Sequence, residues 1–188
     1  MSALVVSQFI SAEARTQLAD TALDYLAWGV LESNQAGPNR FRKKIFNTQY
    51  CNPLMSELGK RIADHLNICE CPVDPYLGWI ISLIQPGGFI QPHRDAHPHY
   101  QQTGDKHLRC NILVQGDDES VRPRIGNMQL ELEEGDLWAF FASDYVHGTN
   151  VIKGDKARIV YQFGFVVPAD YPLATANGVW QSSIDTQD

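Results

Sequence analysis

The sequence lacks several features that would place it in other classes of protein. Its 188 residues contain no run of about 18 consecutive apolar residues, so no membrane-spanning helix is predicted. They contain no internal repeat, low-complexity tract or long linker, and we therefore expect one domain over residues 1–188. The amino-terminal segment has neither the basic residues nor the cleavage site of a secretory signal. The sequence therefore predicts a cytoplasmic protein with no membrane partner.

Cysteine and positive charge are also scarce. The four cysteines do not indicate a disulfide framework in a domain of this size. Fifteen lysines and arginines stand against 22 aspartates and glutamates, and the net charge of −7 disfavours nucleic acid as a partner. One basic run, RFRKK at residues 40–44, departs from this balance. Such a run is most often a solvated face, and otherwise it would meet an anionic group of a substrate.

Helical signals are confined to residues 1–71. The first predicted helix runs from Ser11, as N-cap, to Leu31, with apolar residues spaced four apart on one face. The second begins at Asn52 and Pro53, because a capping side chain followed by proline is typical of a helix start. We expect this helical part to support the rest of the domain.

Residues 72–168 show a different pattern. Short runs rich in β-branched and aromatic residues, such as WIISLI, LRCNILVQ and ARIVYQFGFVV, are separated by turn signals. About seven strands without intervening helices predict a sandwich or barrel, most simply a double-stranded β-helix, or jelly roll. The expected fold class is therefore mainly β with flanking N-terminal helices, followed by a C-terminal tail over residues 169–188.

Histidines gather in one stretch, GGFIQPHRDAHPHY at residues 87–100, which holds three of the six in the chain. Side chains alternate along a strand, so His93 and Asp95 are expected to point to one face and to offer a nitrogen and an oxygen to one metal ion. His97 and His99 follow this segment, and we expect them in an exposed loop rather than among the ligands.

Two protein ligands rarely hold a catalytic metal, so a third ligand is expected from elsewhere in the chain. His65 belongs to the second helix and is expected to pack or to face solvent. His107 lies in the polar segment GDKHLR before a strand. His147 lies in YVHGTN, directly after the apolar run LWAFF, and Arg158 opens the next strand after a KGDK turn. His147 and Arg158 are therefore expected near the same end of one barrel.

The set His93-x-Asp95, His147 and Arg158 resembles the iron(II)- and 2-oxoglutarate-dependent oxygenases, which include prolyl and aspartyl hydroxylases. PGGFIQPHRD is similar to the glycine turn that leads into the first two ligands of that family. GDLWAFFASDYVHGTN is similar to its late apolar strand with the distal histidine. The resemblance covers residues 76–167 and implies a jelly roll with a facial triad of metal ligands.

Two histidines and one carboxylate on one face of an octahedral ion leave three adjacent positions open, which suits non-haem iron. The resemblance implies that His93, Asp95 and His147 bind Fe(II), that 2-oxoglutarate takes two open positions and that O2 takes the third. Arg158 would pair with the distal carboxylate of 2-oxoglutarate, since a guanidinium can meet a carboxylate with two charge-assisted bonds. The implied products are succinate, CO2 and a substrate hydroxylated at an unactivated C–H bond.

Arg109 and Asn111 are further candidates for contact with 2-oxoglutarate. They share one face of the strand LRCNILVQ and are polar in an otherwise apolar run. Buried polar groups need partners, and a bound dicarboxylate would be one. Alternatively, Arg109 pairs with a structural acid and Asn111 bonds the backbone.

Two other classes remain open at this point. The same barrel could be a cupin-like metalloenzyme that does not use 2-oxoglutarate, although such sites usually recruit more histidines and have no need for Arg158. It could also be a non-catalytic jelly-roll binding protein, although complete metal ligands disfavour this. For an oxygenase of this length, the expected substrate is a small molecule or a single amino-acid residue, free or peptidyl. The sequence indicates no oligomeric state.

Overall fold

The computed structural model describes residues 2–95, 97–116, 122–173 and 179–182. Its helices are α1 (Ala12–Ala27), α2 (Pro53–His65) and α3 (Pro98–Thr103). Its strands are β1 (Ser2–Val6), β2 (Glu32–Ser33), β3 (Arg40–Lys44), β4 (Trp79–Ile84), β5 (Lys106–Gln115), β6 (Pro123–Ile125), β7 (Met128–Gln129), β8 (Leu137–Phe141), β9 (His147–Thr149), β10 (Arg158–Val167) and β11 (Val179–Ser182). No helix in these ranges is both long and apolar enough to span a membrane.

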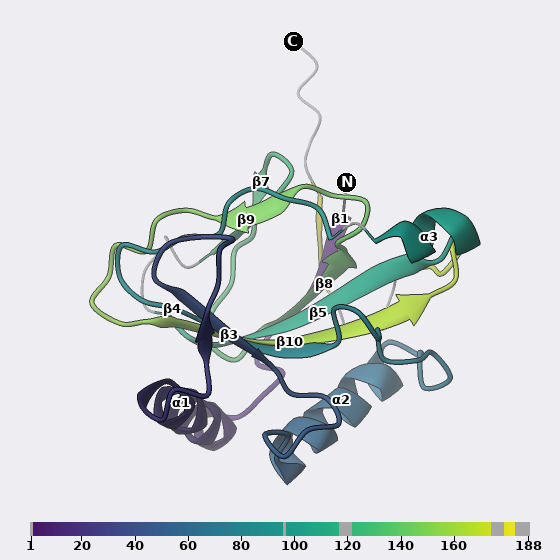
Figure 1. Cartoon of the computed structure of the whole chain (residues 1–188). Helices are drawn as coiled ribbons and strands as arrows, with labels where there is room; N and C mark the ends of the chain where they lie inside the picture. The colour runs from purple at the N-terminus through teal and green to yellow at the C-terminus, as the bar shows by residue number, and fades with distance from the viewer. Residues whose placement is uncertain (1, 96, 117–121, 174–178, 183–188) are drawn as a thin grey trace.

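The strands form two antiparallel sheets. The major sheet has eight strands in the order β11-β1-β8-β5-β10-β4-β3-β2, and the minor sheet has three in the order β7-β6-β9. Figure 1 shows α1 and α2 on one side of the major sheet and β7 and β9 on the other. The mainly β architecture with N-terminal helices on one outer face is as predicted from the sequence.

Alternation along the central strands gives the major sheet two different faces. In β5, Leu108, Cys110 and Ile112 belong to the apolar core under the helices. The residues between them, Arg109 and Asn111, point to the opposite face, as a pleated strand requires. The inner face therefore carries polar side chains between the two sheets, and this is where the candidate site lies.

The two long helices begin as the sequence predicts. The side chain of Ser11 accepts a hydrogen bond from the Ala14 N–H at the start of α1, and Asn52 caps α2 in the same way. The first helix is shorter than predicted. It ends at Ala27, because Gly29 takes a left-handed conformation with φ of 69° that turns the chain away before Leu31.

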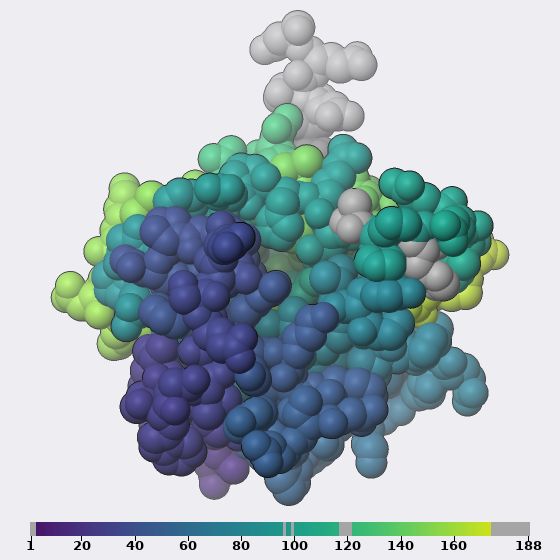
Figure 2. All heavy atoms as spheres, in the orientation of Figure 1, coloured from purple at the N-terminus to yellow at the C-terminus, as the bar shows by residue number. Residues whose placement is uncertain are grey.

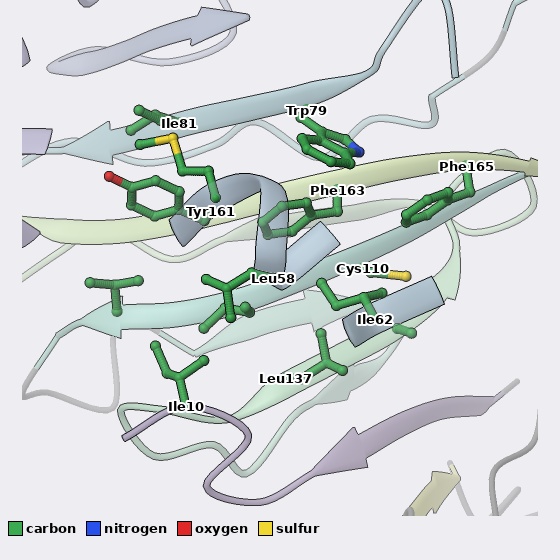
Figure 3. Close-up of a cluster of buried hydrophobic side chains, with 14 of the residues drawn as sticks. Ile10, Leu58, Ile62, Trp79, Ile81, Cys110, Leu137, Tyr161, Phe163 and Phe165 are labelled. Carbon is green, nitrogen blue, oxygen red and sulfur yellow. The ribbon is translucent and has the colours of Figure 1, made fainter. Parts of the chain in front are cut away.

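Gly59 lets α2 approach the sheet closely. Leu58 and Ile62 of this helix belong to the same buried cluster as Phe163 of β10 (Figure 3). A Cβ atom at position 59 would lie 2.2 Å from the Trp79 ring. Close packing of this kind leaves no room for an added methyl group unless the helix or the ring moves.

Gly59→Ala is therefore expected to lower the free energy of unfolding by about 1–3 kcal/mol, the usual cost of overpacking a core. Urea denaturation of the purified protein measures this difference. Lys60→Ala, an exposed change in the same helix, serves as the control and is expected to stay within about 0.5 kcal/mol of the parent. Equal stability of Gly59→Ala and the parent would contradict the close contact with Trp79.

Two parts of the chain differ in secondary structure from the sequence prediction. Residues 1–71, expected to be helical, also contain β1, β2 and β3, and residues 169–188, expected to be a tail, contain β11. These strands have two to five residues each and complete the edges of the major sheet. Runs this short carry too few residues to show an alternating pattern, so their pairing with distant strands decides their structure.

The segment around the clustered histidines also differs from expectation. His93 forms an isolated bridge with His147 and lies outside the named strands. His99, expected in a loop, falls within α3, and its side chain lies outside the described residues. His107, expected in a polar loop, is a fully buried residue of β5.

Candidate metal centre

The fold brings His93, Asp95 and His147 together. One ligand atom from each residue can be chosen so that all three atoms lie within 4.8 Å of one another. His93 and Asp95 come from the segment after β4, and His147 is the first residue of β9. Residues more than 50 positions apart therefore meet at one point, as the sequence predicts.

Backbone hydrogen bonds fix the spacing of the three residues. His93 and His147 exchange two of them, from the His93 N–H at 3.0 Å and from the His147 N–H at 2.8 Å. The Asp95 N–H donates to the Ala142 carbonyl at 2.9 Å. The three side chains are thus held by paired main chain rather than by free loops.

Side-chain hydrogen bonds fix the orientation of both imidazoles. Nδ1 of His93 lies 2.8 Å from the Gln91 carbonyl, and Nδ1 of His147 lies 3.0 Å from the Tyr145 carbonyl. A carbonyl oxygen only accepts, so each Nδ1 carries the proton and each Nε2 keeps its lone pair. The two Nε2 atoms lie 3.5 and 3.6 Å from the two carboxylate oxygens of Asp95.

The protonation states of His147 and Asp95 suit a divalent cation. Burial lowers the pKa of His147 to about 4, so its imidazole is neutral at neutral pH. Burial opposes ionisation of Asp95, but Arg109 and the surrounding histidines together hold the pKa of Asp95 below its ordinary value. Two imidazole lone pairs and one carboxylate are the donor set of a facial triad, so the residues fit Fe(II).

Arg109 pairs with one of the three candidate ligands. Its Nη2 donates to Oδ2 of Asp95 at 2.6 Å, and its Nη1 donates to the side-chain oxygen of Gln162 at 3.0 Å. The acid with which Arg109 pairs is thus a candidate metal ligand and not the separate structural acid of the alternative reading. Contact between Arg109 and 2-oxoglutarate stays a prediction.

A buried hydrogen-bond network next to Asp95 was not predicted from the sequence. Nδ1 of His107 lies 2.6 Å from Oδ2 of Asp74, and the hydroxyl of Tyr100 donates to the same oxygen. The other carboxylate oxygen of Asp74 accepts the backbone N–H groups of residues 76 and 77 at 2.7 and 2.8 Å. Asp74 is 1% exposed and His107 is fully buried.

This network reaches the metal centre through His107, whose Nε2 lies 3.8 Å from Oδ2 of Asp95. The sequence contained one signal for it. His107 precedes Arg109 and Asn111 by two and four positions, and thus shares their strand face. The polar residues of GDKHLR concealed that β5 begins before His107.

Arg158 lies in a narrow pocket beside His147. It is 2% exposed, and Asn111, Trp138 and His147 line the same pocket. The guanidinium lies 5.9 Å from the centre of the Trp138 ring. Burial lowers the pKa of Arg158 to about 9, with a contribution from Arg40, so the side chain stays charged at neutral pH. The side-chain oxygen of Asn111 is buried and has no hydrogen-bond partner among the described residues, so it can accept from a ligand.

A larger cavity of about 510 Å³ is lined by all three residues of the metal centre. Figure 2 shows the molecule hollowed between the blue N-terminal segment and the teal segment that includes α3. The cavity is lined by Ser33, Asn34, Gln35, Ala36, Arg40, Arg42, Leu77, Ile80, Ile90, His93, Asp95, Arg109, His147 and Gln162. A volume of this size suits a small-molecule ligand or one extended side chain.

Solved structures of oxygenases share this fold. A prolyl-4-hydroxylase from Pseudomonas putida matches at 16% identity with a TM-score of 0.62, over 88% of this chain and 92% of the other. HygX from Streptomyces hygroscopicus, with nickel and 2-oxoglutarate bound, matches at 10% identity and 0.62, over 91% and 84%. The non-haem alpha-ketoglutarate-dependent epimerase SnoN from nogalamycin biosynthesis matches at 16% identity and 0.63, over 89% and 78%.

No protein-family model matches the sequence, and no curated protein matches it either. At 10–16% identity, the likeness to the solved structures shows the fold. The chain therefore has the jelly-roll fold of the 2-oxoglutarate-dependent oxygenases, as the resemblance in sequence predicts.

Proposed function

We propose that the chain is an Fe(II)- and 2-oxoglutarate-dependent oxygenase in which His93, Asp95 and His147 bind the metal. The observation that carries this proposal is the orientation of the two imidazoles. Both Nδ1 atoms are occupied by backbone carbonyls, and both Nε2 lone pairs lie beside the carboxylate of Asp95. The oxygenase fold and the solved structures with metal and 2-oxoglutarate support the same assignment.

The residues around the triad would hold and orient the co-substrate. Arg158, charged and buried in the narrow pocket, would pair with the distal carboxylate of 2-oxoglutarate. Asn111 would donate an amide N–H to the co-substrate, and Arg109 would fix the direction of Asp95 while lining both pockets. Bound iron would supply the activation of O2, coupled to decarboxylation of 2-oxoglutarate to succinate and CO2.

Hydroxylation of an unactivated C–H bond is the reaction that we favour. A complete set of three protein ligands supports it, and so does the likeness to a prolyl-4-hydroxylase. The epimerase SnoN has the same fold, so the fold alone does not decide the outcome of the reaction. The proposed substrate is a small molecule or an amino-acid residue, and the cytoplasmic location stays a prediction from the sequence.

An anaerobic absorption spectrum tests the proposal. Fe(II) and 2-oxoglutarate are added to the purified protein, and a weak charge-transfer band is expected in the visible range. The band should be absent with Fe(II) alone and in the His147→Ala variant. Iron binding without the band would indicate a cupin-like metalloenzyme that does not use 2-oxoglutarate. Absence of iron binding would leave the non-catalytic binding protein.

Arg158→Gln is expected to raise the Kd for 2-oxoglutarate about ten- to a hundredfold, because one charge-assisted contact is worth about 1.5–3 kcal/mol. Titration of the charge-transfer band measures this constant. Arg158→Lys keeps the charge but lacks the planar guanidinium. Its Kd for 2-oxoglutarate should therefore lie between those of the parent and of Arg158→Gln. Arg124→Gln, an exposed change in β6, is the control and should leave the constant unchanged. An unchanged Kd in Arg158→Gln would show that another residue holds the co-substrate.

A further inference from the structure

The basic run of the sequence is divided between two environments. In β3, Phe41 packs against the core under the helices, whereas Arg40 and Arg42 line the large cavity. Lys43 bonds to Glu32 on the neighbouring strand. The run is thus not a uniform solvated face, because two of its guanidinium groups line the large cavity beside the metal centre.

Arg40 is buried without an acidic partner. It is 6% exposed, and its Nη1 donates to the side-chain oxygen of Asn34, a neutral acceptor, at 3.1 Å. Its Nε has no hydrogen-bond partner among the described residues. Among the residues that the structure describes, no ion pair joins Arg40 or Arg42 to a carboxylate. Glu32, which lies opposite Arg42 in the sheet, pairs with Lys43 instead.

The charges lining the cavity are unbalanced. Three arginines stand against one carboxylate, Asp95, which is already paired with Arg109. Burial, followed by repulsion from Arg42 and Arg109, lowers the pKa of Arg40 to about 10. The guanidinium is still charged at neutral pH, and Asp95, the carboxylate that attracts it, is already paired with Arg109, so burial of this charge costs free energy. An anionic ligand in the cavity would remove this cost.

The anion position at Arg40 and Arg42 is distinct from the position of Arg158. Arg40 and Arg158 both lie opposite Ile84, on the two sides of β4, so two strand spacings of about 4.8 Å each separate their backbones. Arg158 lines the narrow pocket, whereas Arg40 and Arg42 line the large one. A 2-oxoglutarate molecule chelated at the triad has one distal carboxylate, so it cannot occupy both positions.

We propose that the primary substrate carries a carboxylate or phosphate group, and that Arg40 and Arg42 bind this group in the large cavity. The bond to be oxidised would then face the triad, which lines the same cavity. The identity of the reaction rests on the proposed function, but the anion-binding site does not.

Nuclear magnetic resonance of the arginine Nε–H groups tests the site directly. The protein is first saturated with redox-inert Zn(II) and 2-oxoglutarate, so that the co-substrate position is filled. It is then titrated separately with propionate, with inorganic phosphate and with neutral propionamide. We expect a saturable shift of the Arg40 Nε–H signal with at least one anion and no shift with propionamide. The anion that binds more tightly identifies the group that the substrate carries.

Arg42→Gln, in which a half-buried side chain changes, is expected to weaken this binding about ten- to a hundredfold. Arg40→Gln should do the same, and Arg40→Lys tests whether charge at the buried position suffices if the glutamine variant is unstable. Arg61→Gln is the matched control, because Arg61 lies against Phe9 under the major sheet.

Parallel, non-saturating shifts of all arginine signals would overturn the proposal, and so would unchanged affinity in Arg42→Gln. These outcomes are separable from failure of the oxygenase assignment. If the charge-transfer band appears but no anion binds, the reaction class stands and the substrate class is wrong. If the band is absent, the same titration without metal still tests the anion site.

Discussion

His93→Ala is expected to abolish tight Fe(II) binding, and with it any turnover of 2-oxoglutarate. The change leaves two protein ligands, and two rarely hold a catalytic metal. Loss of a residue that merely orients a ligand already costs about 10–100-fold in metal affinity, so loss of a ligand should exceed this range. Anaerobic equilibrium dialysis with Fe(II) measures the affinity. His93 is the best first choice, because its side chain is 35% exposed and its removal disturbs the core least.

His97→Ala provides the control for this experiment. His97 belongs to the same histidine-rich stretch, but its ring stacks on Tyr76 at 3.5 Å between centroids and lies outside the triad. Its removal should leave the Fe(II) affinity unchanged. Asp95→Ala and His147→Ala should behave as His93→Ala does. Near-native affinity in all three variants would remove these residues as ligands.

Asp74→Asn is expected to lower the free energy of unfolding by about 1.5–3 kcal/mol, because hydrogen bonds to an ionised carboxylate are replaced by weaker ones to a neutral amide. Burial holds His107 neutral by lowering its pKa, so the ring donates Nδ1–H to an ionised carboxylate. An amide at position 74 would turn either a weaker acceptor or an N–H group toward this donor. Urea denaturation at neutral pH gives the difference.

The difference in free energy of unfolding between Asp74→Asn and the parent should depend on pH through the pKa of Asp74. Burial opposes its ionisation, but His107 and Tyr100 hold the pKa of the folded state below that of an unfolded aspartate. The stabilisation by Asp74 is therefore complete above about pH 4, the unfolded value, and is lost as the pH falls toward the folded value. The gap between Asp74→Asn and the parent should narrow in acid. Tyr100→Phe, which removes one of the bonds, should cost less, and equal stability of Asp74→Asn and the parent would exclude a structural role.

The parts of the fold that the sequence predicts are those specified by local pattern. The start of α2 follows from Asn52 and Pro53, and the long strands β5 and β10 follow from their apolar runs. The triad could be predicted from the sequence because two of its members are two residues apart and the third follows an apolar strand. The short strands β1, β2, β3 and β11 were missed, because long-range pairing rather than local sequence makes them strands.

The remaining parts of the site depend on contacts that no local pattern encodes. Arg109 could have paired with any acid, and only the folded chain brings Asp95 to it across 14 positions. Asp74 and His107 are 33 positions apart, and neither stands out in its own segment. The basic run could be solvated or could face a ligand, and the register of β3 on β4 decides that Arg40 and Arg42 face the cavity.

The pairing of β1 with β11 determines how the molecule would respond to a mechanical load. Ser2 lies opposite Ser182, and Val5 lies opposite Val179, in an antiparallel ladder. Ser2, the first residue of β1, and Ser182, the last residue of β11, therefore lie at the same end of the ladder. A force that pulls Ser2 and Ser182 apart would break the hydrogen bonds of this ladder one after another and would not load all of them at the same time. The sheet would thus yield first at the edge formed by β11, which is separated from β8 and β5 by β1.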